Sequence, residues 1–237
     1  MKNLNNKVAY ITGGTKGIGL GIAKALLSTG MKVAISGRKQ QNIDLALEQL
    51  GESDNVMGVV SDVSDILSET RAIEAITSQW GNIDVLIANA GVGYFSPIDT
   101  MSQEQWNEMI ETNLTGAFNT LKAGVESLKR SEGYYLTIAS LAGVNFFAQG
   151  AGYNATKFGL VGFTQAAMLD LRPHNIKVSC IMPGSVATHF RGNIPSSKDD
   201  WKIQAEDIGQ IVVDLLRMPH RTLPSKIEVR PTRPDLK

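Results

Sequence analysis

Short apolar runs alternate along the chain with longer stretches in which apolar positions recur at helical spacing. "KVAYIT" at 7–12 and "MKVAISG" at 31–37 are apolar at consecutive positions and rich in β-branched residues, which is typical of strands. Between them, "GIGLGIAKALLSTG" at 17–30 repeats its apolar residues as a helix does and ends on glycine. These segments predict a strand, a helix and a second strand.

The same alternation continues to near the end of the chain. Five further strand candidates are "NVMGVV", "IDVLIANA", "GYYLTIAS", "IKVSCIM" and "SKIEV", and amphipathic stretches such as 104–130 and 151–171 lie between them. Strands that are apolar on both faces and separated by helices indicate a parallel sheet covered on both sides. We therefore predict an α/β chain that forms a single-domain Rossmann fold over residues 1–237, with a doubly wound seven-stranded parallel sheet.

One polar segment, "SVATHFRGNIPSSKDDWKIQ" at 185–204, interrupts the alternation. It follows the sixth strand candidate and precedes the helical pattern "EDIGQIVVDLL". A polar insertion at such a place predicts a short, flexible substrate lid. No linker-like composition, charge block or repeat marks a domain boundary.

Composition narrows the classes of function. Hydrophobic residues make up 43% of the 237 positions, which is enough for a sizeable core. The 23 basic and 23 acidic residues balance, so no global field favours a nucleic acid or an anionic membrane. A single cysteine, Cys180, and a polar amino terminus predict a cytoplasmic protein without an internal disulfide. No apolar run reaches membrane-spanning length, and the three histidines lack metal-ligand spacing.

A glycine-rich stretch, "TGGTKGIG" at 12–19, follows the first predicted strand. Glycines there allow a tight turn and let backbone amides and a helix N-terminus approach a pyrophosphate. An ordinary turn is the alternative, but the place of the stretch in a doubly wound pattern favours nucleotide binding. Its glycine spacing resembles that of the short-chain dehydrogenases/reductases. The predicted cofactor-binding residues here are Gly13, Thr15, Lys16, Gly17, Ile18 and Gly19.

The end of the second predicted strand carries no acidic residue. Enzymes that bind NAD usually place a carboxylate there for the ribose 2′-hydroxyl, whereas a 2′-phosphate needs cations. Gly37 occupies that position, Arg38 follows it, and Lys16 lies in the glycine-rich stretch. Because a guanidinium can bind a phosphate through two hydrogen bonds, we predict NADP(H) as the cofactor, with Arg38 and Lys16 at the 2′-phosphate. Lys39 is interpreted as a solvated turn residue.

Tyr153 and Lys157 stand four positions apart in "AGYNATKFGL", and that spacing brings side chains together on one helix face. A phenol has a pKa of about 10, and a neighbouring ammonium is expected to lower it by favouring the phenolate. Tyr153 could then exchange a proton with a carbonyl or alcohol oxygen that Ser140 holds by a hydrogen bond. Two amphipathic side chains on a buried helix are the alternative interpretation.

Asn113, Ser140, Tyr153 and Lys157 match the catalytic tetrad of the short-chain dehydrogenases/reductases in type, order and spacing. The resemblance extends to about Val229. It implies that Lys157 also holds the nicotinamide ribose and that the region of Asn113 keeps a water in a proton relay. Asparagine is a poor helix former, yet Asn113 lies inside a long helical pattern.

The resemblance also implies cofactor contacts in three short segments that follow predicted strands. Polar groups at such strand ends can line the ligand groove of a doubly wound sheet, although each segment alone also fits a turn or a helix cap. The implied residues are Asp62 and Val63 at the adenine, Asn89, Ala90 and Gly91 in a supporting turn, and Pro183, Gly184, Val186 and Thr188 at the nicotinamide amide.

The sequence gives less information about the substrate than about the cofactor or the catalytic residues. Tyr94, Phe95 and Phe147 predict a mostly apolar pocket, and Arg191 in the lid is the evident anchor for an anion, with a solvated loop cation as the alternative. The tetrad context is nearest to reductases of 3-oxoacyl thioesters. The terminal "IEVRP" resembles members that act on 3-hydroxy acids or on small aldehydes and ketones. His189, beside the lid, is a further candidate for contact with the substrate.

Two expectations concern partners and the nature of the activity. The resemblance implies a homodimer or homotetramer, although the ending "LPSKIEVRPTRPDLK" lacks the Gly-Gly turn of many family members. A non-catalytic NADP-binding sensor or scaffold is the alternative from another class. The complete tetrad favours an enzyme, because a binding module has no use for an activated tyrosine.

Overall fold

The computed structural model describes residues 3–51 and 53–233. It shows seven parallel strands in one sheet, in the order β3-β2-β1-β4-β5-β6-β7. The strands are β1 (Val8–Ile11), β2 (Lys32–Gly37), β3 (Val56–Val60), β4 (Val85–Ala88), β5 (Tyr134–Ile138), β6 (Lys177–Pro183) and β7 (Lys226–Val229). The predicted doubly wound seven-stranded sheet is therefore confirmed.

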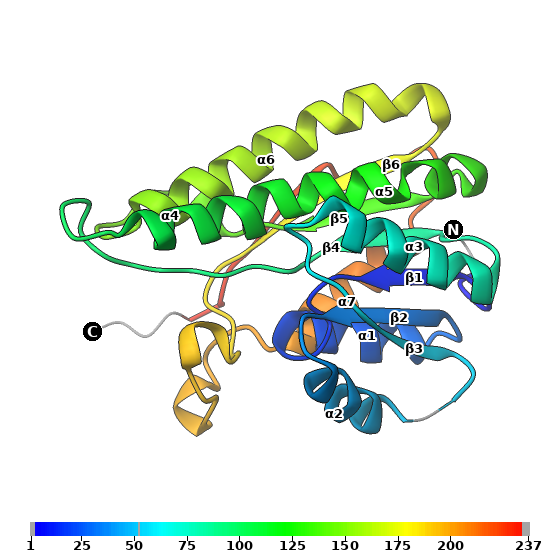
Figure 1. The fold of residues 1–237 in the computed structure, drawn as a ribbon, viewed down its shortest axis with the longest axis horizontal. Coiled ribbons are helices and arrows are strands. Elements are labelled where there is room, and N and C mark those ends of the chain that lie inside the picture. Colours follow the sequence, from blue (N-terminus) through cyan, green and yellow to red (C-terminus); the bar gives the residue numbers. More distant parts are fainter. Residues whose placement is uncertain (1–2, 52, 234–237) are drawn as a thin grey trace.

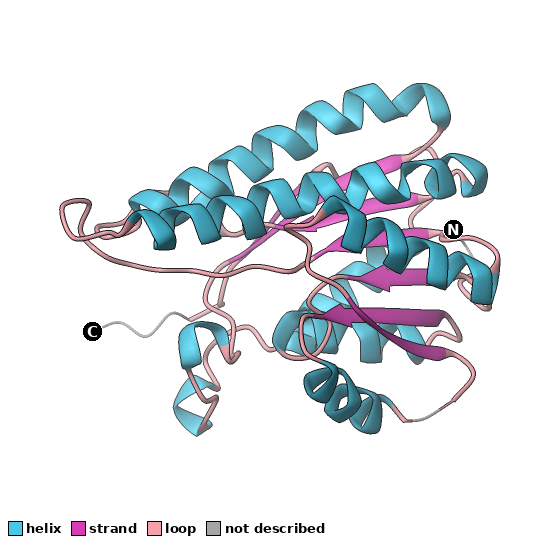
Figure 2. Cartoon of the chain, in the orientation of Figure 1, coloured by secondary structure: helices cyan, strands magenta, loops and turns pink. Residues whose placement is uncertain are grey.

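Helices cover both faces of this sheet, as Figures 1 and 2 show. The helices α1, α2 and α7 pack on one face, and α3, α5 and α6 pack on the other. The bounds are α1 (Gly17–Leu27), α2 (Gln40–Leu50), α3 (Ile66–Trp80), α4 (Gln103–Ile110), α5 (Gly116–Ser131), α6 (Ala151–Leu171) and α7 (Ala205–Arg217).

The core follows from the continuous apolar runs of the central strands. Every residue of β1, β4 and β5 is buried, so side chains alternate between the two apolar clusters on opposite faces of the sheet. The outer strands β3 and β7 are partly exposed. Side-chain caps fix two of the helix starts: Asp65 accepts a hydrogen bond from the Leu67 N–H before α3, and Ser102 forms a capping box with Gln105 before α4.

The long helical pattern at 104–130 is not one regular α-helix. A π-helical turn at Glu111–Thr115 separates α4 from α5, and Asn113 lies within it. Such turns widen the helix by one residue and occur often at functional sites. The helix predicted at 151–171 matches α6.

The segment at 185–204 contains two short 3-10 turns, at Phe190–Gly192 and Ser197–Asp199, instead of a long helix or strand. In Figure 1 it stands at the end of the molecule toward which the strand arrows point, between β6 and α7. Val186 and Ile203 pair as an isolated bridge, which ties the two ends of the segment together.

Candidate active site

A groove of about 1530 Å³ lies at the carboxyl ends of the strands. Ligands of open α/β sheets bind at this edge. Among the predicted residues that line it are Gly13, Thr15, Lys16, Gly17, Ile18, Arg38, Val63, Asn89, Ala90, Gly91, Ser140, Tyr153, Lys157, Pro183, Gly184, Val186 and Thr188. The structure thus brings together residues that are up to 175 positions apart in the sequence.

The turn between β1 and α1 holds its backbone close to the neighbouring strand end. Gly13 and Gly17 have φ values of +63° and +56°, which side chains rarely allow. A Cβ atom on Gly13 would lie 2.9 Å from the Cα of Ala90. The Asn89 side chain donates hydrogen bonds to the carbonyls of Thr12 and Gly13 at 2.9 and 3.0 Å. The turn therefore keeps its backbone close to that of Ala90, with no side chain between them.

The end of β2 is basic. Arg38, Lys39 and Lys16 line this end of the groove, and no Asp or Glu of the described residues lines the groove anywhere. The Arg38 guanidinium lies 3.8 Å from a carboxylate oxygen of Glu108 on α4. The other oxygen of Glu108 accepts a hydrogen bond from the Tyr94 hydroxyl at 2.5 Å, and this bond raises the pKa of Tyr94.

A buried carboxylate bonds to a residue that lines the same end of the groove. Glu69 of α3 has no exposed surface and accepts hydrogen bonds from the hydroxyls of Tyr10, Ser61 and Thr120 at 2.9, 2.6 and 2.8 Å. Three donors can compensate for the burial of such a group. Burial, with the charge of Glu69 adding to it, raises the pKa of Tyr10. Because Ser61 lines the groove, this network fixes part of its wall.

Tyr153 and Lys157 occupy the first two turns of α6, and both are buried. The Lys157 ammonium donates a hydrogen bond to the Ile138 carbonyl at the end of β5, at 3.1 Å, and lies 5.7 Å from the centre of the Tyr153 ring. Ser140 follows the same strand and its hydroxyl accepts from the Ala142 N–H at 3.1 Å. Three of the four predicted catalytic residues therefore meet at one point of the groove.

The expected lowering of the Tyr153 pKa by Lys157 is not found. Burial raises the pKa of Tyr153 to about 12, and a hydrogen bond with Ser140 opposes this shift only in part. Burial also lowers the pKa of Lys157 to about 8. The physical reason is that both groups lose water, while the Lys157 ammonium is directed to the Ile138 carbonyl.

Asn113 stands behind the groove wall. Its amide accepts a hydrogen bond from the Val92 N–H at 2.8 Å and donates to the Val92 carbonyl at 2.9 Å and to the Thr156 hydroxyl at 3.0 Å. Asn113 therefore ties the π turn to the segment after β4 and to α6. This long-range role explains why an asparagine is found inside a helix.

Replacing Asn113 with Ala should lower the free energy of unfolding by about 1–3 kcal/mol, because the partly buried N–H and carbonyl of Val92 lose their partner and the Thr156 hydroxyl keeps only its bond to the Tyr153 carbonyl. Urea unfolding followed by circular dichroism measures the change. Asn107→Ala, at an exposed position of α4, is the matched control and should have little effect. Equal stability of the two variants would show that the Asn113 contacts contribute nothing.

Aromatic rings form the wall beside Tyr153. The Phe95 ring packs edge-on against Tyr153 with centroids 5.3 Å apart and against Phe147 at 4.9 Å. Phe190 of the lid segment lies 5.8 Å from Tyr153, and a Cβ atom on Gly93 would lie 2.5 Å from the Phe190 ring. The lid segment thus touches the candidate catalytic residue directly. This agrees with the predicted apolar pocket.

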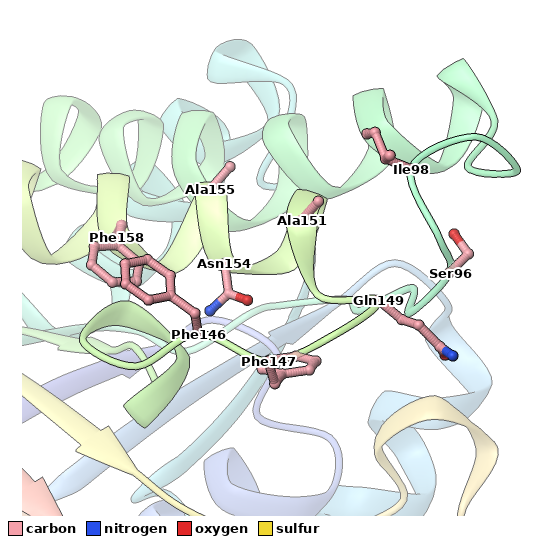
Figure 3. A pocket seen from close by; sticks show the side chains of 9 residues that line it. All are labelled: Ser96, Ile98, Phe146, Phe147, Gln149, Ala151, Asn154, Ala155 and Phe158. Atoms are coloured by element: carbon pink, nitrogen blue, oxygen red, sulfur yellow. The ribbon is translucent and has the colours of Figure 1, made fainter.

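A second hollow of about 480 Å³ adjoins this wall and shares Phe146 and Phe147 with the groove. Figure 3 shows Phe146 next to Phe158 on one side of it and Ser96 with Gln149 on the other. The Phe146 and Phe158 rings stack with centroids 4.9 Å apart. The Ser96 hydroxyl is buried without a hydrogen-bond partner.

Four predicted residues do not line the groove, and others that line it were missed. Gly19, Asp62 and Asn113 of the predicted catalytic and cofactor sites are absent from its lining, and so is Tyr94 of the predicted substrate pocket. The Asp62 carboxylate accepts from the N–H and the hydroxyl of Ser64, as a turn cap does. The missed residues include Ser36, Asn42, Ser61, Thr112 and Arg230. Ser36, Ser61 and Arg230 stand at or just after strand ends, a signal that could have identified them.

Neither a cluster of metal ligands nor a membrane-spanning helix is found in the described part of the chain. No group of three or more His, Cys, Asp or Glu side chains there could hold a metal ion. None of the helices described is both long and apolar enough to cross a bilayer.

Comparisons with known proteins give the family. The model of the short chain dehydrogenase family matches residues 7–199. "Dehydrogenase/reductase SDR family member 4" of Rattus norvegicus is 36% identical over 207 residues, which cover 86% of this chain and 72% of that protein.

Two solved structures agree along nearly the whole chain. An alcohol dehydrogenase from the archaeon Thermococcus sibiricus, complexed with 5-hydroxy-NADP, has a TM-score of 0.87 and 31% identity, and the match covers 98% of this chain and 100% of that one. A 3-ketoacyl-(acyl-carrier-protein) reductase from Brucella melitensis, complexed with NADH, has a TM-score of 0.88 and 25% identity over 97% and 99% of the two chains. The chain therefore belongs to the short-chain dehydrogenase/reductase family and is an NAD(P)-binding oxidoreductase acting on CH–OH groups.

Proposed function

We propose that this protein interconverts a carbonyl and an alcohol with NADP(H), with Tyr153 as the acid and base. The observation that carries the proposal is the placement of Ser140, Tyr153 and Lys157 at one point of a groove whose opposite end is basic. The experiment is to follow NADPH oxidation with a panel of ketones, aldehydes and 3-oxoacyl thioesters. Absence of turnover with every member would favour the alternative, a cofactor-binding sensor or scaffold.

The residues present fit a phosphorylated dinucleotide. The backbone of the Gly13 turn would hold the pyrophosphate, and Arg38 and Lys16 would hold the 2′-phosphate. Pro183, Val186 and Thr188 would hold the nicotinamide amide. When bound, the nicotinamide supplies or accepts the hydride.

The side chains of this protein would manage the proton. Tyr153 is protonated at neutral pH, because burial holds its pKa at about 12, and it can donate the proton to a carbonyl oxygen during reduction. Ser140 can donate a hydrogen bond to the same oxygen and stabilise developing negative charge. Lys157 lies 5.7 Å from the centre of the Tyr153 ring and donates a hydrogen bond to the Ile138 carbonyl, and it would hold the nicotinamide ribose. Oxidation of an alcohol uses the same groups in reverse.

The preference for NADP over NAD rests on Arg38, since the two cofactors differ only in the 2′-phosphate. Arg38→Ala should weaken NADPH binding about tenfold to a hundredfold, as expected for loss of a charge-assisted contact, and should leave NADH binding nearly unchanged. Fluorescence titration of the enzyme with each cofactor measures both. Lys39→Ala is the control and should have a smaller effect on NADPH binding.

Glu108→Gln should strengthen NADPH binding, because the Glu108 carboxylate competes with the 2′-phosphate for Arg38. Tighter binding of NADH by the unaltered protein would refute this role of Arg38.

Three substrate classes compete for the proposed site: 3-oxoacyl thioesters, small 3-hydroxy acids with their oxo forms, and simple aldehydes and ketones. The aromatic wall of Phe95, Phe147 and Phe190 is compatible with all three. The substrate panel decides among them.

We also propose that the protein is a cytoplasmic homodimer or homotetramer of single-domain subunits. Apolar side chains exposed on neighbouring helices support association: Phe118 on α5 is 49% exposed and Leu169 on α6 is 57% exposed. Phe118 and Phe163 also contact each other edge-on across these helices. Exposed apolar patches of this kind commonly mark interfaces between subunits.

A further inference from the structure

The groove carries more positive charge than its cofactor end alone would use. The chain as a whole is neutral, with 23 basic and 23 acidic residues. No Asp or Glu of the described residues lines the groove. Its basic side chains are Lys16, Arg38 and Lys39 at the end of β2, Lys157 beside Tyr153, and Arg191, Lys202 and Arg230 near the lid segment.

Among the cations near the lid segment, Arg191 differs from the other two. Lys202 pairs with Asp199 at 2.5 Å, and Arg230 pairs with Glu228 at 2.8 Å. No carboxylate of the described residues lies within ion-pairing distance of Arg191. Arg191 therefore presents an uncompensated charge to the groove.

Arg191 is also held in place. Its guanidinium lies over the Phe95 ring, 4.0 Å from the centroid, which is a close cation–π contact. Its backbone has a φ of +58°, an uncommon conformation for a residue with a side chain, and such conformations gather at ligand sites. The preceding residue, Phe190, packs on the Tyr153 ring. Arg191 is exposed, and these contacts fix its position beside the groove.

The position of Arg191 relative to Tyr153 is bounded by two distances. The centroids of the Tyr153 and Phe95 rings are 5.3 Å apart, and the guanidinium carbon lies 4.0 Å from the Phe95 centroid, so it is at most about 9.3 Å from the Tyr153 centroid. A short chain of carbons can span the space between a carbonyl at Tyr153 and an anion at Arg191. We propose that the substrate is a short oxo acid whose carboxylate binds Arg191. This rests on the proposed function and selects the acid class among its candidate substrates.

Reduction adds a hydride from the reduced nicotinamide to the oxo carbon and a proton from the Tyr153 hydroxyl to the oxo oxygen. The products are a hydroxy acid, the oxidised cofactor and the Tyr153 phenolate, which takes a proton from water before the next turnover. The carboxylate keeps its charge throughout, so Arg191 binds substrate and product alike and selects the substrate without entering the chemistry.

The test compares 3-oxobutanoate with its methyl ester, which keeps the reacting ketone and removes the charge. Reduction by NADPH is followed for the unaltered protein and for Arg191→Gln. The ratio of kcat/KM for acid over ester should fall about tenfold to a hundredfold in the variant, as expected for loss of a charge-assisted contact. Arg191→Lys should retain part of the ratio. Lys198→Gln removes an exposed cation of the lid segment that does not line the groove, and it should leave the ratio unchanged.

A binding measurement needs neither turnover nor cofactor. Trp201 lines the groove, so its fluorescence should report titration with butanoate, an unreactive carboxylate. Arg191→Gln should weaken that binding by a similar factor. If neither acid nor ester is reduced, the proposed reaction fails, and the butanoate titration still decides the role of Arg191. An unchanged ratio, or an equal rise in the KM for NADPH with both substrates, would assign Arg191 to another role and overturn the inference.

Discussion

Tyr153→Phe is expected to reduce kcat about 10²–10⁴-fold while leaving NADPH binding within about twofold of its original value. The variant loses only the hydroxyl that would exchange the proton. The ring keeps its contacts with Phe95 at 5.3 Å and Phe190 at 5.8 Å, so the shape of the groove should be preserved. Steady-state kinetics with the substrates found in the panel, together with fluorescence titration of NADPH, separate the loss of chemistry from a loss of binding.

The matched control is Tyr134→Phe, which removes another largely buried hydroxyl. Tyr134 begins β5, at the edge of the sheet opposite the groove, and its hydroxyl bonds to Ser179 at 2.7 Å. This variant should lose some stability and keep kcat near that of the unaltered protein. Comparable kcat values in the two variants would mean that the Tyr153 hydroxyl does not transfer the proton.

The sequence alone predicts the sheet and most of the groove because both depend on local patterns. The continuous apolar runs of β1, β4 and β5 require burial on two faces, which in turn requires helices on both sides. Since all strands are parallel, residues after each strand end gather at one edge. The glycine-rich turn, Arg38 and Ser140 could therefore be placed together without coordinates.

Contacts between residues far apart in the chain could not be predicted in the same way. Asn113 in the π turn bonds to Val92, which is 21 positions away. The approach of Glu108 to Arg38, and the packing of Phe190 against Tyr153, depend on how separate segments meet in space. The pKa of Tyr153 was misjudged for this reason too: spacing indicated a neighbouring ammonium, whereas burial decides the shift.

Lys157→Met is expected to abolish turnover and, at pH 7, to raise the free energy of unfolding by about 2–3 kcal/mol. Lys157 is 4% exposed, and burial lowers its pKa from 10.5 to about 8. One pKa unit corresponds to about 1.4 kcal/mol, so the buried ammonium destabilises the fold by about 3 kcal/mol when it is protonated. Loss of its hydrogen bond to the Ile138 carbonyl offsets part of the gain, by about 1 kcal/mol.

The gain in stability of Lys157→Met over the unaltered protein should decrease as pH rises. Below pH 8 the Lys157 amine is protonated in both the folded and the unfolded protein, so the full penalty of burial is present. Between pH 8 and 10.5 the folded protein releases this proton before the unfolded chain does, and the unaltered protein therefore gains stability relative to the variant as pH rises. The difference between the two proteins should be largest at pH 7 and small near pH 10.5.

Urea unfolding at pH 7 and pH 10 measures this difference. Lys122→Met is the control, because Lys122 is exposed on α5 and its removal should change stability by less than about 0.5 kcal/mol at either pH. A destabilised Lys157→Met protein, or a gain that does not shrink with pH, would show that the buried ammonium carries no such penalty. A residue that lowers stability in this way persists only where activity requires its charge, and the groove beside Tyr153 is the place where a buried positive charge has a use.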